Sequence, residues 1–304
     1  MQWKSVCCAV QGRGHMRRDL PCQDCVARLE VGGVHVIALS DGAGSAAMSH
    51  YGAQRVVDCA AEFVAEKFFD IVASEDGRSV TQELLTVVRR ALQAESNLRG
   101  CELKDLAATL LLAAVSDEKF FLAHLGDGVI GYLSDAGLKV ATTPDNGEFS
   151  NETVFVTSAD AALHMRIFRG DLKKICAFVL MSDGTEQSLY NKHKRTLAPA
   201  IKRLMHRTCL VDGDIFTAQL QHALRTVVAE NTHDDCSIAL LARNSTQLPP
   251  LERLILFERR ELERITGSPT FRRVREKISR CDRISDLLKR PLTLRQFIRR
   301  RDIS

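Results

Sequence analysis

The sequence of 304 residues contains no long apolar run, no export signal and no nucleotide-binding P-loop. A membrane-spanning helix needs about 20 consecutive apolar residues, so no membrane span is expected. The N-terminus, MQWKSVCCAVQGRG, lacks the charged and then apolar pattern of a secretory signal, which favours a cytoplasmic protein. Without a P-loop, a nucleotide-driven kinase or ATPase has no support. What remains is the composition of an ordinary globular protein, with 45% hydrophobic and 26% charged residues.

Cysteine is plentiful but lacks the spacing of a metal site or a disulfide framework. The ten cysteines are irregularly distributed, and without an export signal we expect them to be reduced thiols. Cys22 and Cys25 form the single Cys-x-x-Cys pair. Structural zinc sites usually combine two such pairs, so this pair by itself does not predict zinc.

The net charge of +4 hides an acidic body and a basic C-terminal segment. Residues 247–304 contain 16 Lys and Arg against 8 Asp and Glu, whereas residues 1–246 contain 26 against 30. Paired prolines at 249–250 interrupt regular structure where the composition changes. We therefore predict a folded domain at 1–246 and a basic helical extension at 247–304.

The first 246 residues alternate short apolar runs with longer helical patterns. Nine runs have the length and the flanking turn residues of β-strands. The spacing of apolar residues predicts helices at about 46–73, 79–98, 196–206 and 212–230. The runs at 119–125, 128–134 and 138–142 are joined by links too short for a crossover helix, so these strands are predicted to be antiparallel. Antiparallel strands with a few long helices favour an α+β fold in which sheets pack together and helices lie outside.

Acidic residues stand at the ends or starts of several predicted strands, in the segments PCQDC, SDGAGS, LGDGV, MSDGT and THDDCSIAL. Carboxylates at strand ends can be aimed into one shared space, and their oxygens suit hard divalent ions such as Mg²⁺ and Mn²⁺. A single Asp-Gly pair could be only a hairpin turn, but several together predict a metal site. The repeated Ser-Asp-Gly at 40–42 and 182–184 is predicted to end two neighbouring strands. The acidic residues are Asp24, Asp41, Asp127, Asp183, Asp234 and Asp235.

The ordered set of motifs resembles the metal-dependent type 2C protein phosphatases. The segments QDC, SDGAGS, ATLLLAAV, AHLGDGVIGYL, VLMSDGTEQSLY and HDDCSIALL follow the order of that family from about residue 5 to 243. Gln-Asp in the first motif, where the family otherwise has Glu-Asp, resembles a bacterial subgroup. The resemblance implies a four-layer α-β-β-α sandwich of two antiparallel sheets flanked by helices, which agrees with the α+β prediction. It also implies a catalytic domain at 1–246 that removes phosphate from phosphoserine and phosphothreonine.

The resemblance places two metal ions, Mn²⁺ or Mg²⁺, among these aspartates. Asp41 would bridge both ions, with the Gly42 carbonyl as a further ligand, and Asp183 and Asp234 would complete the protein ligands of the first ion. Gly184 is expected only to turn the chain. Two divalent ions about 3.5–4 Å apart lower the pKa of a bridging water and offset the charge of a phosphate monoester, so no cysteine or serine nucleophile is required.

Three further positions concern the second ion, a bound water and a third ion. Gln23 stands where the family has a glutamate ligand of the second ion. Its amide oxygen can still bind a metal but donates less charge, so the second ion is expected to bind more weakly. Asp24 would orient a metal-bound water through a hydrogen bond. Asp127 resembles the position that helps to hold a third, weaker ion in bacterial members.

The phosphate-binding arginine of the family lies a few residues before the acidic pair. Arg13, Arg17 and Arg18 are candidates, and Arg18 has the spacing closest to that expected. A guanidinium can hold phosphate through two parallel hydrogen bonds, while a solvated loop arginine is the simpler alternative. His15 is either a general acid for the leaving group or an exposed loop histidine. His233 either hydrogen-bonds a ligand carboxylate or lies on a surface loop.

The polar segment 144–158 lies where similar proteins have a substrate-facing loop. Asn151, Glu152 and Thr153 are the candidate substrate contacts, and a plain connector is the alternative. The basic extension contains amphipathic pieces interrupted by Pro269 and Pro291. It either packs against the body or a dimer partner, or docks on an acidic partner, nucleic acid or an anionic surface. Its aromatic residues are too sparse for a base-stacking surface, so nucleic acid is not an expected partner.

Two functions of different class follow from these features. The first is a metal-dependent phosphoprotein phosphatase whose partner is a phosphorylated protein, such as a Ser/Thr kinase or its target. The second is a catalytically weak or inactive regulatory protein on the same scaffold, acting through the basic extension. Gln23 in place of a glutamate and the basic extension motivate this second hypothesis. The sequence leaves the oligomeric state open.

Overall fold

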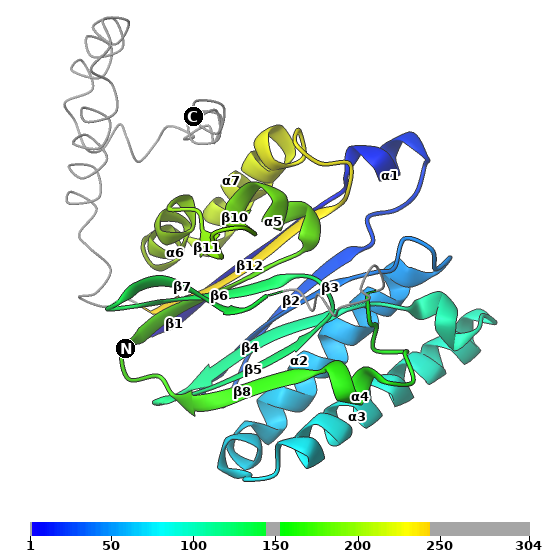
Figure 1. The fold of residues 1–304 in the computed structure, drawn as a ribbon, viewed down its shortest axis with the longest axis horizontal. Helices are drawn as coiled ribbons and strands as arrows, with labels where there is room; N and C mark the ends of the chain where they lie inside the picture. The colour runs from blue at the N-terminus through cyan, green and yellow to red at the C-terminus, as the bar shows by residue number, and fades with distance from the viewer. Residues whose placement is uncertain (1, 144–152, 244–304) are drawn as a thin grey trace, which may run out of the picture.

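Two antiparallel sheets pack face to face between two layers of helices in the computed structural model, which describes residues 2–143 and 153–243 (Figure 1). The first sheet contains, in spatial order, β1 (Trp3–Val10), β12 (Cys236–Arg243), β9 (Ile175–Met181), β6 (Val129–Ser134) and β7 (Gly137–Thr142). The second contains β2 (Asp24–Val31), β3 (Val34–Asp41), β4 (Leu110–Ser116), β5 (Lys119–Leu125) and β8 (Arg166–Asp171). The predicted α+β sandwich is therefore confirmed.

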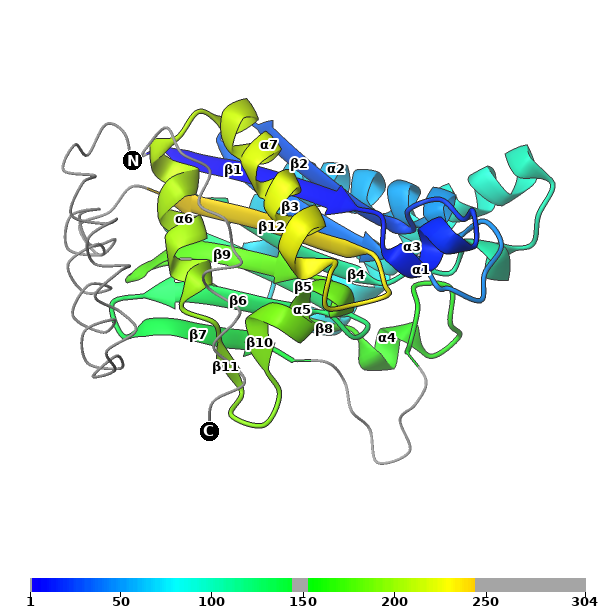
Figure 2. The ribbon, with the colours of Figure 1, turned by 90° about the horizontal axis from the view of Figure 1, so that it is seen from above.

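Long helices cover the outer face of each sheet (Figure 2). α2 (Ser49–Ala73) and α3 (Gly77–Arg99) pack on the second sheet, while α6 (Ala200–Leu210) and α7 (Gly213–Ala223) pack on the first. A π-helical turn at Leu224–Val228 continues α7. In the described part of the chain, no helix is long and apolar enough to cross a membrane. The shorter elements are α1 (Arg13–Arg17), a 3-10 helix (Leu103–Leu106), α4 (Ala161–His164), α5 (Asp183–Leu189), β10 (Tyr190–Asn191) and β11 (Thr196–Leu197).

The inner strands are buried on both faces, which explains their continuous apolar composition. Along β4, Leu110 and Leu112 pack under the helices of the second sheet, whereas Leu111 and Ala113 pack between the two sheets. A strand with one face in water would instead alternate apolar and polar residues. The core therefore has three layers of packed side chains, one between the sheets and one under each pair of helices.

The two longest helices, α2 and α3, match their predicted ranges to within three residues, and in α3 local signals set both ends. α3 begins after Asp76, whose carboxylate accepts hydrogen bonds from the backbone N–H groups of Arg78 and Ser79. Such an N-cap stabilises a helix by about 1 kcal/mol. α3 ends at Gly100, which has a φ of +66°. Predictions at 46–73 and 79–98 are thus confirmed, whereas α6 begins four residues later than its predicted start at 196.

The predicted pairing of the strand at 119–125 with the strand at 128–134 is wrong. β5 lies between β4 and β8 in the second sheet, whereas β6 lies between β9 and β7 in the first. The link of Gly126, Asp127 and Gly128 therefore carries the chain from one sheet to the other. Gly126 has a φ of +116°, and a Cβ at Gly128 would lie 2.6 Å from the Met181 carbonyl oxygen. Both positions need glycine, and Asp127 is left at the opening between the sheets.

The two Ser-Asp-Gly segments also lie in different sheets. Asp41 ends β3 in the second sheet, whereas Asp183 follows β9 in the first and begins α5. The expectation of neighbouring strands was wrong, because an identical tripeptide carries no information about sheet assignment. The consequence is that the two carboxylates approach one space from opposite layers of the sandwich.

Candidate metal centre and active site

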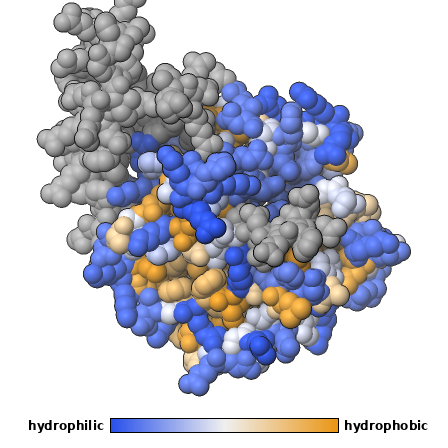
Figure 3. All heavy atoms as spheres, viewed as in Figure 1, coloured by the Kyte–Doolittle hydropathy of each residue, from blue (hydrophilic) through white to orange (hydrophobic). Residues whose placement is uncertain are grey.

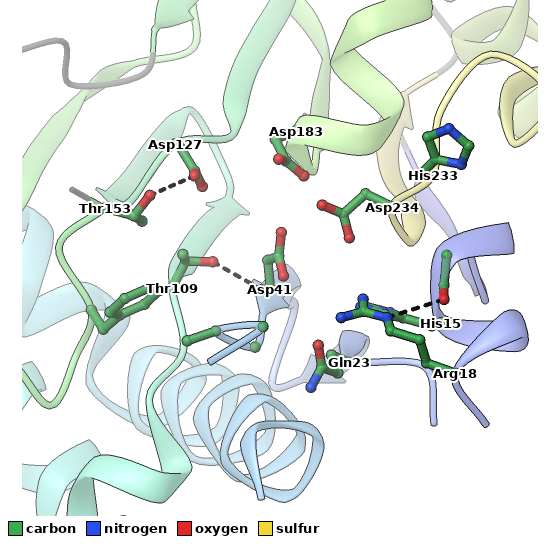
Figure 4. Close-up of a pocket in the computed structure, with 15 residues that line it drawn as sticks. His15, Arg18, Gln23, Asp41, Thr109, Asp127, Thr153, Asp183, His233 and Asp234 are labelled. Atoms are coloured by element: carbon green, nitrogen blue, oxygen red, sulfur yellow. Dashed lines mark hydrogen bonds between the residues drawn. The ribbon is translucent and has the colours of Figure 1, made fainter. Parts of the chain in front are cut away.

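A cavity of about 290 Å³ opens at the end of the sandwich where these acidic turns meet. Figure 4 shows Asp41, Asp127, Asp183 and Asp234 around one central space, although they come from four separate segments of the chain. The remaining residues that line the cavity are Gly14, His15, Arg18, Gln23, Gly42, Ala43, Gly44, Thr109, Thr153, Phe155 and His233.

Asp41 is held in place by its backbone. Its N–H donates to Thr109 Oγ1 at 2.8 Å, and its carbonyl oxygen accepts from the Thr109 N–H at 2.8 Å. Ser40 Oγ donates to the Thr109 carbonyl oxygen at 2.5 Å. Thr109, which precedes β4, therefore joins the two central strands of the second sheet beside the cavity. Sequence reasoning missed this residue, because a single threonine before an apolar run carries no distinctive signal.

The carboxylates around the cavity repel one another. Burial raises the pKa of Asp41 well above its usual range, and the charges of the nearby aspartates raise it further. Burial also raises the pKa of Asp183 to about 6, and the charges of Asp234 and Asp127 act in the same direction. Carboxylates that are close together and partly buried bind protons or cations, because this removes their mutual repulsion. A divalent cation would favour the ionised carboxylates.

The donor set fits a hard ion that keeps part of its hydration. Asp41, Asp183 and Asp234 present carboxylate oxygens, and the Gln23 amide oxygen is buried beside them without a hydrogen-bond partner. Within the described residues, no group of three Asp, Glu, His or Cys side chains is spaced to hold a metal ion by itself. An ion here would therefore bind partly through water, which is usual for Mg²⁺.

Asp24 lies behind the cavity and does not line it. It pairs in register with Asp41 in the β2–β3 ladder and is buried. Burial raises the pKa of Asp24 to about 8 and the charge of Asp235 adds to this, while the hydroxyls of Ser237 and Ser182 act in the opposite direction. The water-orienting role of Asp24 stays a prediction.

Asp235 connects two distant segments of the chain. Its Oδ1 accepts from the Gly12 N–H at 2.6 Å, its Oδ2 accepts from the Gln23 N–H at 2.5 Å, and His15 Nδ1 lies 2.8 Å from Oδ2. Asp235 is 1% exposed. This carboxylate fixes the segment that carries His15, Arg18 and Gln23 against the start of β12. Sequence reasoning placed Asp235 among the acidic residues but gave it no role, since Asp234 beside it was the expected ligand.

Two glycines allow the close backbone contacts around Asp235. A Cβ at Gly12 would lie 2.2 Å from the Asp234 carbonyl carbon, and a Cβ at Gly184 would lie 2.0 Å from the Asp235 carbonyl oxygen. Gly184 was expected only to turn the chain, but it lies in the first turn of α5 and is required by this packing. Gly42 likewise approaches Ser49, where a Cβ would lie 2.8 Å from its carbonyl oxygen.

Among the candidate phosphate ligands, Arg18 lines the cavity, whereas Arg13 and Arg17 do not. Arg13 Nε instead donates to the Ala229 carbonyl oxygen at 2.9 Å. Arg18 Nε donates to the Gly14 carbonyl oxygen at 3.2 Å, and Figure 4 shows its guanidinium directed toward the cavity. His15 also lines the cavity and is buried, so the alternative of an exposed loop histidine does not hold.

His233 and Thr153, which lies in the segment before α4, occupy opposite sides of the cavity. His233 is exposed, and its ring is turned away from the carboxylate of Asp234 (Figure 4). Thr153 Oγ1 donates to Asp127 Oδ2 at 2.7 Å, so Thr153 contacts the residue predicted to hold a third ion. Asn151 and Glu152, the predicted substrate contacts, lie outside the described residues.

A cysteine nucleophile is not supported at this site. The spacing Cys-x5-Arg of cysteine-dependent phosphatases occurs at Cys7 to Arg13 and at Cys22 to Arg28. Burial raises the pKa of the Cys7 thiol to about 11 and also raises that of Cys22, whereas a nucleophilic cysteine needs a lowered pKa. Neither cysteine lines the cavity. The nine cysteines of the described residues are free thiols.

The fold and the site define a phosphatase-like sandwich with an acidic centre. Residues 11–227 match the family model described as protein phosphatase 2C, and the chain belongs to this family. Serine/threonine-protein phosphatase 3 of Escherichia coli (strain K12) is 27% identical over an alignment of 256 residues that covers 79% of this chain and 98% of that protein. The prediction of the family and of a protein serine/threonine phosphatase is confirmed at this level.

Solved structures of bacterial phosphatases share the fold. The serine/threonine phosphatase Stp1 from Staphylococcus aureus superposes with a TM-score of 0.58 and 15% identity, over 81% of this chain and 96% of that one. A serine/threonine phosphatase of S. agalactiae has a TM-score of 0.55 and 15% identity, over 80% of this chain and 100% of that one. At these identities the likeness concerns the architecture of the two sheets and their helices. The subgroup assignment from Gln23 and Asp24 stays a prediction.

Proposed function

We propose that this chain is a metal-dependent phosphoprotein phosphatase that hydrolyses phosphoserine and phosphothreonine at a centre of two Mn²⁺ or Mg²⁺ ions. The observation that carries the proposal is the convergence of four aspartates from four segments on one cavity, with an arginine at its edge. Such a concentration of half-buried negative charge is unfavourable for folding, which makes a structural role a poor explanation. The substrate class and the number of ions are parts of the proposal.

The proposed ligands are divided between the two sheets. Asp41 and the Gly42 carbonyl approach from the second sheet, and Asp183 and Asp234 from the first. Gln23 would contact the second ion through its buried amide oxygen. Asp127, with its hydrogen bond from Thr153, would contribute to a third and weaker ion. When bound, the two ions would supply a nucleophile at neutral pH and offset the charge of the phosphate.

The remaining side chains would act on the substrate itself. Arg18 lies at the mouth of the cavity, where a guanidinium can bind phosphate oxygens and orient the ester. His15 also lines the cavity, and its Nδ1 faces Asp235 Oδ2 at 2.8 Å. Nε2 is therefore the ring atom left to deliver a proton to the leaving hydroxyl of serine or threonine. Water is the nucleophile, so no covalent intermediate with the chain is required.

The alternative of an inactive regulatory protein is not favoured. It was motivated by Gln23, but Gln23 lines the same cavity as the four aspartates and keeps an acceptor oxygen there. The effect of a glutamine is expected on the affinity for the second ion, not on the presence of a site. A kinase partner, a cytoplasmic location and the role of residues 247–304 remain predictions.

The proposed reaction can be tested by its metal requirement. The full chain is expected to hydrolyse a chromogenic phosphate ester and a phosphoserine peptide in millimolar Mn²⁺, and to lose this activity in EDTA. Phosphate release with and without added metal measures the effect. Turnover that survives EDTA would contradict the metal mechanism. Hydrolysis of the ester without any hydrolysis of phosphoserine or phosphothreonine peptides would contradict the substrate class.

Metal binding should also stabilise the fold in a pH-dependent way. The pKa values of Asp183 and Asp24 are raised from 3.8 to about 6 and about 8. Between pH 4 and 8 the folded metal-free protein therefore holds protons that the unfolded chain has lost, so this contribution to the free energy of unfolding decreases as pH rises. Mn²⁺ binds the ionised carboxylates, so we expect it to raise Tm more at pH 8 than at pH 5. Thermal unfolding with KCl of equal ionic strength is the control, and an equal rise at both pH values would contradict the site.

A further inference from the structure

The hairpin of β10 and β11 carries four consecutive basic residues, Lys192, His193, Lys194 and Arg195, and all four are exposed. Its base is anchored, because Tyr190 and Leu197 are buried in the apolar layer beneath α6 and α7. The Lys194 N–H donates to Asn191 Oδ1 at 2.9 Å, which shapes the turn. The hairpin is therefore a fixed basic projection on the domain 1–246, which is acidic overall.

The hairpin is joined to the cavity through α5. This helix begins at Asp183, which lines the cavity, and its seven residues span about 10 Å at about 1.5 Å per residue. Lys192 Nζ lies 2.6 Å from Glu186 Oε1, and Glu186 is 1% exposed. The negative charges of Glu186, Asp183 and Asp127 all contribute to raising the pKa of Lys192. The ammonium group of Lys192 thus stands within the electrostatic field of the acidic cavity.

We propose that the hairpin 192–195 is a docking surface for acidic side chains that flank the phosphorylated residue of a protein substrate. Lys194 and Arg195 are the residues free to make these contacts, because Lys192 is engaged by Glu186. Figure 3 shows strongly hydrophilic side chains over the place where Figure 1 labels α5, β10 and β11. This inference rests on the proposed phosphatase function, since that function brings a phosphopeptide to the cavity.

Distance and charge favour an acidic segment of a phosphorylated protein as the ligand of the hairpin. An extended peptide advances about 3.3 Å per residue, so side chains about three to five residues from the phosphorylated one would reach the hairpin. The four aspartates of the cavity repel an acidic peptide, and a basic surface nearby offsets this repulsion and increases the rate of encounter. The basic segment 247–304 of the chain itself is not a suitable occupant, because its 16 Lys and Arg exceed its 8 Asp and Glu.

The test compares two phosphoserine peptides of equal length, one with glutamates and one with glutamines at the flanking positions. Binding to the full chain is measured by fluorescence anisotropy without metal, so it does not depend on turnover, and kcat/KM is measured in Mn²⁺. The variant is K194Q/R195Q, which removes two charges and keeps the buried Glu186 paired. R78Q/R90Q on the exposed side of α3 removes the same charge far from the hairpin.

The native chain is expected to favour the acidic peptide about tenfold in both measurements, and K194Q/R195Q should abolish most of this preference while R78Q/R90Q retains it. Higher salt should weaken the preference as well. Equal binding of both peptides by the native chain, or an equal loss in the two variants, would overturn the proposal. So would hairpin-dependent binding of a DNA duplex at least as tight as that of the acidic peptide. Failure of ester hydrolysis in Mn²⁺ would count against the phosphatase function alone, because peptide binding is measured without metal and does not require hydrolysis.

Discussion

Replacing Asp41 with asparagine is expected to lower kcat for phosphate-ester hydrolysis by about a thousandfold or more, because this carboxylate is proposed to hold both metal ions. A thousandfold corresponds to about 4 kcal/mol of transition-state stabilisation. The asparagine amide preserves the shape of the side chain. The two hydrogen bonds that join Asp41 to Thr109 are made by the Asp41 backbone, so the substitution leaves them in place. Steady-state kinetics in saturating Mn²⁺ measures the loss.

The same substitution should stabilise the protein in EDTA. The pKa of Asp41 is raised by burial and by the charges of four neighbouring aspartates, so its ionised form opposes folding when no cation is present. A neutral amide removes that repulsion, and Tm of Asp41→Asn should exceed that of the native chain. Asp117→Asn is the matched control, since it makes the same chemical change at an exposed turn with a φ of +49°. Retained activity, or equal losses in the two variants, would rule out the role of Asp41.

Replacing Asp235 with alanine is expected to reduce the free energy of unfolding by about 3 kcal/mol and kcat/KM by about a hundredfold. The change leaves the Gly12 and Gln23 N–H groups without their acceptor and removes the carboxylate that lies 2.8 Å from His15 Nδ1. It also relieves the repulsion between Asp235 and Asp24. Hydrogen bonds to a charged group contribute about 1.5–3 kcal/mol each, so the loss of the two hydrogen bonds outweighs this relief.

The effect on catalysis follows from what Asp235 positions. Without it, the segment that carries Arg18 and Gln23 loses its attachment to the start of β12, so KM and the Mn²⁺ requirement should rise together. Urea unfolding and a Mn²⁺ titration of activity measure the two effects. Asp214→Ala is the control, because the Asp214 side chain is 95% exposed and its ion pair with Arg28 spans 3.8 Å. A variant with unchanged stability and an unchanged Mn²⁺ requirement would show that Asp235 does not position this segment.

The prediction for Asp41 reflects a property of the acidic cavity, which favours metal binding at the expense of stability in the metal-free protein. Four carboxylates in a half-buried space repel one another, and burial raises the pKa of Asp41 and Asp183. Substitutions that remove this charge are expected to stabilise the fold and abolish activity. Such opposition between stability and activity is common where an active site concentrates like charges.

Most elements of the fold were predictable because their signals are local. The ranges of α2 and α3 followed from apolar spacing, and the inner strands followed from runs such as that of β4. β8 was missed because RIFRGD mixes charged and apolar residues, which is common in a strand at the edge of a sheet. α5 was missed because its seven residues are too few for a helical period to be recognised.

The site was predictable to the extent that it consists of motifs. Asp41, Asp127, Asp183 and Asp234 were all singled out before the structure showed them around one cavity. Contacts between segments distant in the chain carry no local signal. One such contact joins Asp235 to Gly12, His15 and Gln23, which are more than 200 residues away in the chain. Another is the hydrogen bond between the Asp41 N–H and Thr109 Oγ1.

The residues that we propose to carry the chemistry, and most of the strands and long helices, were predictable from the sequence, because side-chain type and apolar spacing are properties of a short stretch of chain. The structure was needed to show that the two Ser-Asp-Gly turns lie in opposite sheets and that the link at Asp127 crosses between them. It also decided that Asp24 lies behind the cavity, whereas Arg18 lies at its edge. These outcomes depend on how two sheets pack against each other, and packing minimises the free energy of the whole chain, which no short stretch of sequence encodes.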